Sequence, residues 1–193
     1  MARAVSAGPV APIAPVTAVV TAFDRAAQTI ETLRRIAACR PRPAEILVHV
    51  DGAAQSCAGA IRSAWPEVRV LLSDANVGPG GGRNRLIAQA AYPIVASFDD
   101  DSYPIDGDYF SRLCEVFDGF PGASVVDARV QHAGEPAAPA TPAAAWVADF
   151  TGCGCAYRRD HFLETGGYLP LPAAYFMEEV DLALRLHARG RRV

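Results

Sequence analysis

Apolar residues along the chain form short runs that alternate with segments of helical periodicity. The runs are rich in β-branched residues, which is typical of strands buried on both faces. Between the first two runs, Ile30, Leu33 and Ile36 recur at the spacing of one helix face. The first half of the chain is therefore expected to contain strands at 16–22, 45–50, 68–72 and 94–98, and helices at about 25–39, 58–64, 82–91 and 108–117.

The second half of the chain has a less regular pattern. Residues 146–157 alternate enough to predict a strand, with Gly152 and Gly154 marking a bulge or a close approach of the backbone. An Ala- and Pro-rich loop is expected at 132–145, and another loop before the last helix, up to residue 176. The remaining expected elements are strands at 124–130 and from 191, and helices at about 159–164 and 178–189.

Strands that alternate with helices predict an α/β fold with a mostly parallel sheet and helices on both faces. In such sheets, ligands bind beyond the C-terminal edges of the strands. Asp24, Asp51 and the run 99–101 each follow an expected strand directly. We therefore expect these carboxylates to gather at one edge of the sheet.

The chain has 193 residues, of which 51% are hydrophobic, enough for one domain with a sizeable core. We expect this domain at 16–193, after a disordered tail at 1–15 that is rich in Ala and Pro. The net charge is −3 with scattered basic residues, a pattern that argues against a nucleic-acid partner. No apolar run approaches the roughly 20 residues that a transmembrane helix needs. The five cysteines lack a metal-binding spacing, and we interpret them as reduced thiols of a cytoplasmic protein.

Three consecutive acids, Asp99, Asp100 and Asp101, end the apolar run at 94–98. Adjacent like charges repel and raise one another's pKa unless a cation offsets them. In an extended segment Asp99 and Asp101 would face one way and Asp100 the other. Two carboxylates at a strand edge can hold a hard divalent ion that also takes phosphate oxygens. A solvated acidic turn is the alternative interpretation.

The glycine-rich segment 76–84 does not match known nucleotide-binding loops. A dinucleotide fingerprint would need Gly at position 83, which is Arg, and a P-loop would need Gly-Lys-Ser/Thr. Arg83 at a helix N-terminus could still reach a phosphate, or it could be a solvated residue of a flexible turn. Asp51, before Gly52, could accept hydrogen bonds from a nucleobase or be an ordinary turn acid.

Glu179 occupies the first turn of the last expected helix. At 100° per residue it points away from the face of Glu178 and Asp181, toward the side of Ala183 and Leu186. A carboxylate turned toward apolar neighbours is buried and paired, or lines a cleft. The helix dipole would help to keep it ionised, as a general base requires. A helix-start acid favoured only by the dipole is the alternative.

Taken in order, six segments of the chain resemble glycosyltransferase family 2, whose members have the GT-A fold. Together they extend from the first strand to the end of the chain. The segments are Thr21 to Arg25, Glu45 to Gly52, Asn76 to Asn84, Phe98 to Asp101, Thr151 to Tyr168, and Glu178 to Leu182.

The resemblance implies a metal-dependent, inverting transfer of a sugar from a nucleotide-diphosphate donor to an acceptor hydroxyl. Asp101 would bind Mn²⁺ or Mg²⁺, and Glu179 would deprotonate the acceptor. The donor, a UDP- or dTDP-sugar, would bind in a half that ends at about residue 102, and an acceptor half would begin at about 103. The donor would contact Thr21, Phe23, Asp24, Asp51, Arg83, Asp99 and Asp100.

The chain departs from the family pattern at several positions. Val50 and Ala53 replace an Asp and a Ser of one motif, and Glu179 replaces the usual Asp. The chain also ends before the expected acceptor-binding elements, so we expect a GT-A domain truncated at its C-terminus. Two other functions stay open: a sugar-phosphate nucleotidyltransferase, and a non-catalytic module that binds nucleotide sugars. The acceptor and self-association into a homo-oligomer are also left open.

Overall fold

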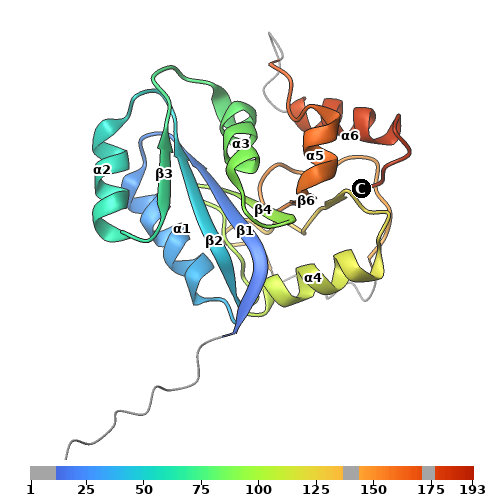
Figure 1. Cartoon of the computed structure of the whole chain (residues 1–193). Coiled ribbons are helices and arrows are strands. Elements are labelled where there is room, and N and C mark those ends of the chain that lie inside the picture. The colour runs from blue at the N-terminus through green and yellow to red at the C-terminus, as the bar shows by residue number, and fades with distance from the viewer. Residues whose placement is uncertain (1–11, 137–143, 171–176) are drawn as a thin grey trace, which may run out of the picture.

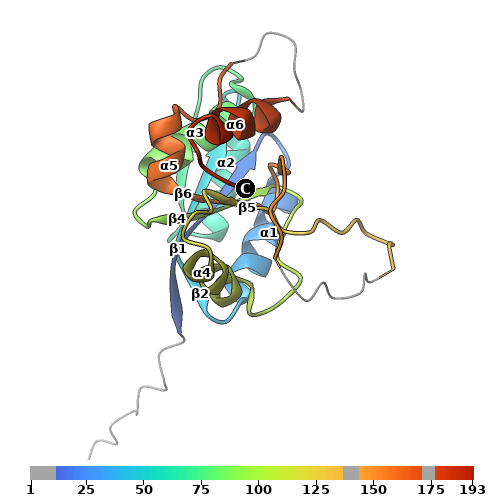
Figure 2. The ribbon, with the colours of Figure 1, turned by 90° about the vertical axis from the view of Figure 1, so that its right-hand side faces the viewer.

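The computed structural model describes residues 12–136, 144–170 and 177–193. One mixed sheet runs through the molecule, with helices on both of its faces (Figures 1 and 2). Its strands are β1 (Ile13–Ala22), β2 (Arg42–Val50), β3 (Arg69–Leu72), β4 (Ile94–Asp99), β5 (Val125–Val126) and β6 (Ala156–Arg158). The helices are α1 (Ala26–Ala38), α2 (Gln55–Ala64), α3 (Gly78–Gln89), α4 (Tyr109–Gly119), α5 (Arg159–Thr165) and α6 (Glu178–His187).

The strand order in the sheet is β3-β2-β1-β4-β6-β5. The first four strands of the chain pair in parallel, and β6 pairs antiparallel with both β4 and β5. The helices α1, α2 and α3 connect successive parallel strands, as the alternating pattern predicted. This order places β1 between β2 and β4, so the C-terminal ends of these three strands are neighbours.

Alternate strand residues bury into two separate hydrophobic cores. Val20 and Val48 face α1, α2 and α4, whereas Val19, Leu47 and Val95 face α3, α5 and α6. Because side chains alternate along a strand, nearly continuous apolar runs supply both cores at once. The face of α3, α5 and α6 is the one that carries the polar site described below.

The N-terminal boundary differs from the expected one. β1 begins at Ile13, because Ile13 and Ala14 pair with Arg42 and Pro43 of β2. The expectation that 13–15 belong to a disordered tail was therefore wrong, and residues 1–11 lie outside the described part.

The strands expected in the second half are much shorter in the structure. Only Val125–Val126 of the first and the end of the second, β6, are in the sheet. Residues 146–155 instead run as irregular backbone, and Gly154 has a φ of 80° that no strand adopts. Residues 137–143 and 171–176 of the two expected loops lie outside the described part. The expected strand from residue 191 is represented by a single parallel bridge between Arg192 and Ala123.

Two helix starts also differ from prediction. α3 begins at Gly78 rather than near 82, with a proline in its first turn. Proline suits this position because its missing N–H would have no partner there anyway. α2 begins at Gln55 rather than near 58. α1 begins close to the expected position, after Arg25, and no side-chain hydrogen bond caps it.

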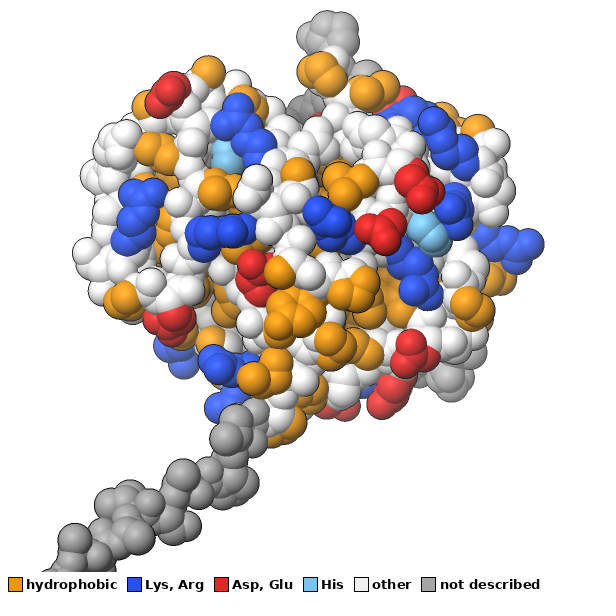
Figure 3. All heavy atoms as spheres, viewed as in Figure 1, with side chains coloured by type: hydrophobic (Ala, Val, Ile, Leu, Met, Phe, Trp, Pro, Cys, Tyr) orange, Lys and Arg blue, Asp and Glu red, His pale blue; other side chains and the backbone are white. Residues whose placement is uncertain are grey.

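Within the described residues, no helix is long and apolar enough to cross a membrane. All five cysteines are free thiols. Figure 3 shows one face of the molecule, on which basic side chains are spread among acidic, hydrophobic and other polar groups, with several of them near a histidine on the right of the view.

Candidate active site

A cleft of about 650 Å³ opens at the C-terminal ends of β1, β2 and β4. The irregular segment before β6 and the first turn of α6 complete its walls. The cleft brings together all nine residues that sequence reasoning selected. These are Thr21, Phe23, Asp24, Asp51, Arg83, Asp99, Asp100, Asp101 and Glu179.

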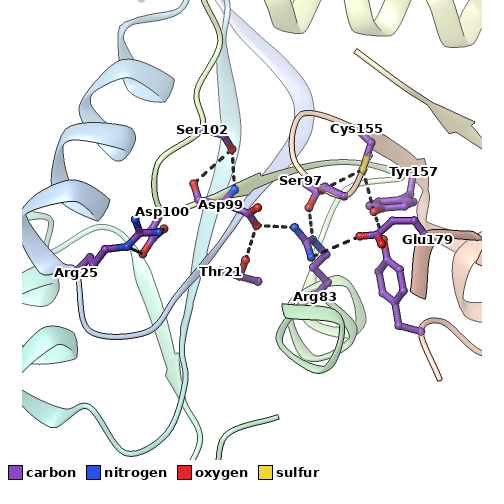
Figure 4. A network of polar contacts seen from close by, with 12 residues as sticks. Thr21, Arg25, Arg83, Ser97, Asp99, Asp100, Ser102, Cys155, Tyr157 and Glu179 are labelled. Atoms are coloured by element: carbon purple, nitrogen blue, oxygen red, sulfur yellow. Dashed lines mark hydrogen bonds and ion pairs between the residues drawn. The ribbon is translucent and has the colours of Figure 1, made fainter. Parts of the chain in front are cut away.

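Asp99 lies at the centre of a hydrogen-bonded group on the floor of the cleft (Figure 4). Its carboxylate accepts hydrogen bonds from the Thr21 hydroxyl at 3.0 Å and from Arg83 Nη2 at 2.5 Å. Parallel pairing places Thr21 directly opposite Asp99, so the sheet register fixes this contact. Arg83 Nε also donates to the Ser97 hydroxyl at 3.0 Å, and this links α3 to two positions of β4.

The Arg83 side chain is only 2% exposed. Burial acts to lower its pKa, but Asp99 and the neighbouring phenols and thiol raise it more, so the pKa lies above its ordinary value. Arg83 is thus a permanent buried cation. This rules out the solvated arginine of a flexible turn that the sequence left open.

Glu179 lies on the other side of Arg83, in the first turn of α6 (Figure 4). Its Oε1 is 4.0 Å from Arg83 Nη1, and its side chain is 12% exposed. Burial raises the pKa of this carboxyl, and the Arg83 charge partly offsets the rise. The helical projection was therefore right that Glu179 turns toward the buried side of α6, where Ala183 and Leu186 are packed.

Gly152 passes directly over this pair. A Cβ at this position would overlap Glu179 Oε1 and would lie 3.1 Å from Arg83 Cζ and Nη2. The sequence indicated a bulge or a close approach here, and the structure shows a close approach. The absence of a side chain at Gly152 is what lets the wall of the cleft touch both charged groups.

Asp100 and Asp101 both pair with Arg25. The Asp100 carboxylate is buried and accepts hydrogen bonds from Arg25 Nε and Nη2, and its carbonyl accepts one from Thr32. Asp101 lies 3.1 Å from Arg25 Nη1, and 47% of its side chain is exposed. β4 ends at Asp99, so the alternation expected to carry Asp101 back to the side of Asp99 does not extend that far. Sequence reasoning did not select Arg25, although it follows the first strand within a segment that resembled the family motif.

The Asp51 carboxylate organises the loop between β3 and α3. Its oxygens accept hydrogen bonds from the Ser73 hydroxyl at 2.6 Å and from the N–H groups of Val77 and Gly78 at 2.9 to 3.0 Å. Burial acts to raise its pKa, but these donors lower it more, so the pKa lies below the usual value. Asp51 thus lines the cleft while its oxygens are largely occupied by its own chain.

We expect Asp51→Asn to lower the free energy of unfolding by about 1–3 kcal/mol, because an amide cannot accept all these bonds and leaves buried donors unpaired. Since the folded pKa is depressed, this stabilisation is present above the ordinary Asp pKa of about 3.9 and is lost as pH falls through the lower folded value. Urea midpoints at neutral and acidic pH test both points. Asp74→Asn, at an exposed position in the same loop, is the control. Equal midpoints for both variants at neutral pH would contradict this role of Asp51.

Phe23, Asp24 and His49 line the cleft near the ends of β1 and β2. Phe23 is 47% exposed, and its ring lies against Gly52, where a Cβ would come within 2.7 Å of Cε2. His49 is buried beside Thr21. Its Nε2 finds no hydrogen-bond partner among the described residues.

The donor set fits a divalent cation that is shared with a phosphate. Within the described residues, no group of three or more His, Cys, Asp or Glu side chains could hold a metal alone. Mg²⁺ and similar ions, however, are commonly held by one or two carboxylates together with substrate phosphates. Asp101 has the exposed oxygens for such a site, and Asp99 lines the same cleft.

The sequence model of glycosyl transferase family 2 matches residues 17–146 of the chain. No curated protein matches the sequence. Among solved structures, mannosyltransferase PcManGT from Pyrobaculum calidifontis, in complex with GDP-Man and Mn²⁺, is similar with a TM-score of 0.72 and 18% identity, over 95% of this chain and 56% of that one.

A second similar structure is TarS 1–349 of S. aureus, with a TM-score of 0.68 and 15% identity, over 88% of this chain and 54% of that one. The complex of the same fragment with UDP-GlcNAc gives a TM-score of 0.68 and 16% identity, over 88% of this chain and 52% of that one. The chain thus spans about half the length of these proteins, and the likeness shows a common fold.

Proposed function

Because the chain belongs to glycosyl transferase family 2, we propose that it is the donor-binding part of a metal-dependent, inverting glycosyltransferase. It would move a sugar from a nucleotide diphosphate to an acceptor hydroxyl. The observation that carries the proposal is one cleft that holds a half-exposed carboxylate, Asp101, and a largely buried one, Glu179, together with a buried arginine that contacts both Asp99 and Glu179.

The nucleotide would occupy the end of the cleft formed by β1 and β2. The exposed Phe23 ring offers a surface for stacking a base, and Asp24 and Asp51 lie beside it. Thr21 and Asp99 would face the ribose, with Asp100 held behind them by Arg25. PcManGT is complexed with GDP-Man and TarS with UDP-GlcNAc, so their nucleotides differ. The binding experiment below therefore compares nucleotides that carry different nucleobases.

Asp101 would hold Mn²⁺ or Mg²⁺ against the diphosphate. The cation would offset the negative charge that develops on the leaving diphosphate. Arg25, which pairs with Asp101 at 3.1 Å, would then keep Asp100 as its partner through two hydrogen bonds.

Glu179 would accept the proton of the acceptor hydroxyl. A general base works best when its pKa lies near the working pH, and burial raises the pKa of Glu179 in that direction. Attack by the deprotonated hydroxyl on the face opposite the diphosphate would invert the anomeric carbon. The acceptor would enter beside Glu179, between α6 and the segment that contains Gly152.

Binding of nucleotide diphosphates tests the proposal without requiring turnover. In the presence of Mn²⁺, one of UDP, dTDP or GDP is expected to raise the unfolding temperature. At a hundredfold excess over Kd the stabilisation is about 2.7 kcal/mol, roughly 5–10 °C for a domain of this size. The effect should require Mn²⁺.

Asp101→Ala is expected to abolish this Mn²⁺-dependent stabilisation. The exposed Asp106, which pairs with Arg112 outside the cleft, provides the control variant Asp106→Ala. An unchanged response in Asp101→Ala would refute the metal assignment. If none of the three nucleotides changed the melting temperature of the wild type, donor binding itself would be wrong. Stabilisation by a nucleoside triphosphate and a sugar phosphate instead would favour a nucleotidyltransferase.

A further inference from the structure

Arg83 contacts residues on both sides of the proposed chemistry. Its Nη2 donates to Asp99 at 2.5 Å on the donor side, and its Nη1 lies 4.0 Å from Glu179 Oε1 on the acceptor side. Ser97 fixes the third edge of the guanidinium through Nε. The three contacts come from β4 and α6, so they depend on tertiary packing and not on any local motif (Figure 4).

Burial makes this shared contact strong. The Arg83 side chain is 2% exposed and that of Glu179 12%. Charges in such surroundings interact over several ångströms with little screening, unlike pairs at the surface. Gly152 covers the guanidinium and the Glu179 carboxylate from one side, which further restricts water between them.

Among the residues that the structure describes, the other neighbours of Glu179 cannot replace Arg83 as a counter-ion. Asp99 and Glu178 are acidic and act to raise the pKa of Glu179. Two further neighbours, Cys155 and Tyr168, have pKa values that burial raises, so they stay neutral. The groups that face Glu179 from α3, β4, α6 and the segments beside β6 are Arg83, Asp99, Glu178, Cys155 and Tyr168.

We propose that Arg83 is a positioning residue that couples the two sides of the site: its single buried charge is shared by Asp99 and Glu179, so the state of one carboxylate sets how firmly the other is held. This inference rests on the proposed function of Glu179 as base. When a bound donor engages Asp99, Arg83 is left with Glu179 as its main partner, and the base is held ionised. By linkage, ionisation of Glu179 favours occupation of the donor side to the same extent.

Direct titration of Glu179 tests the coupling in the chain without ligand or turnover. Carboxyl signals of ¹³C-labelled glutamate are followed by NMR against pH, and the signal of Glu179 is identified by its loss in Glu179→Gln. Arg83→Met should move the Glu179 midpoint to higher pH. Asp99→Asn should move the Glu179 midpoint to lower pH, because Glu179 then no longer shares the Arg83 charge with Asp99. Arg112→Met, which removes an exposed arginine paired with Asp106, should leave it unchanged.

The double variant separates coupling through Arg83 from direct repulsion between the carboxylates. If Arg83 carries the coupling, Asp99→Asn shifts the midpoint less in the Arg83→Met background than in the wild type. Equal shifts in both backgrounds overturn the proposal. Should Arg83→Met not fold, Arg83→Lys keeps the buried charge but cannot reach both carboxylates, and the midpoint must still rise. An unchanged midpoint in Arg83→Lys would then overturn it.

The outcome of the Glu179 titration can be told apart from the outcome of the nucleotide-binding test. A missing thermal response to every nucleotide would reject the glycosyltransferase assignment while leaving the titration intact. Conversely, normal binding of nucleotide and Mn²⁺ with a Glu179 midpoint insensitive to Arg83 would reject only the coupling.

Discussion

Replacing Glu179 with Gln is expected to reduce sugar transfer by about a hundred- to ten-thousandfold, the range typical for loss of a general base. The amide keeps the size of the side chain and its place beside Arg83, but it cannot accept the acceptor's proton. Nucleotide and Mn²⁺ should still bind, weakened only by the loss of the coupling through Arg83, because the donor contacts lie on the other side of Arg83. Transfer and donor binding are measured in the same preparation.

The same substitution should make the folded chain more stable at neutral pH. The pKa of Glu179 is raised in the folded state, so the ionised carboxylate is disfavoured there, and stability falls as pH rises through that pKa. Removing the titrating group removes this penalty. Glu164→Gln, at an exposed residue of α5 that pairs with Arg191, is the control for both measurements. Full transfer by Glu179→Gln would show that another group is the base.

Gly152→Ala is expected to lower transfer by about a hundredfold, although it adds only one methyl group. The new Cβ would overlap Glu179 Oε1 and crowd the Arg83 guanidinium. The carboxylate is the end of a side chain that can rotate, so it would move aside while the fold persists. A displacement of about 1 Å at a reacting group commonly costs a factor of this size.

Transfer rate, donor affinity and the unfolding midpoint together test this prediction. The expected pattern is a large loss of rate with donor binding retained and a small loss of stability. Gly59→Ala is the control, because a Cβ there meets nothing within 4 Å and its helical position favours alanine by roughly 0.5–1 kcal/mol. A normal rate in Gly152→Ala would mean that the position of Glu179 does not limit the reaction.

The alternation of apolar runs and helical periodicity was enough to predict the parallel part of the sheet. A strand buried on both faces needs a continuous apolar run, and a crossover helix needs a 3.6-residue period, so both signals are local. The same reasoning placed Asp51 and Asp99 at strand ends, and parallel strands bring such ends to one edge. It failed for 124–130 and 146–157, where similar alternation belongs to two short strands and irregular backbone.

By itself, the sequence determined which side chains reach the cleft, because the predicted site residues lie at or just after the ends of strands, or in the first two turns of helices, and the periods of these elements are encoded locally. Only the tertiary structure decided how those side chains are partnered. In the folded chain Arg25 pairs with Asp100 and Asp101, and Asp51 accepts hydrogen bonds from the loop between β3 and α3. Arg83 is buried between Asp99 and Glu179. Charges pair according to distance and burial, and residues 75 or 96 positions apart, such as Arg25 and Asp100 or Arg83 and Glu179, come close only when the sheet and α6 have packed.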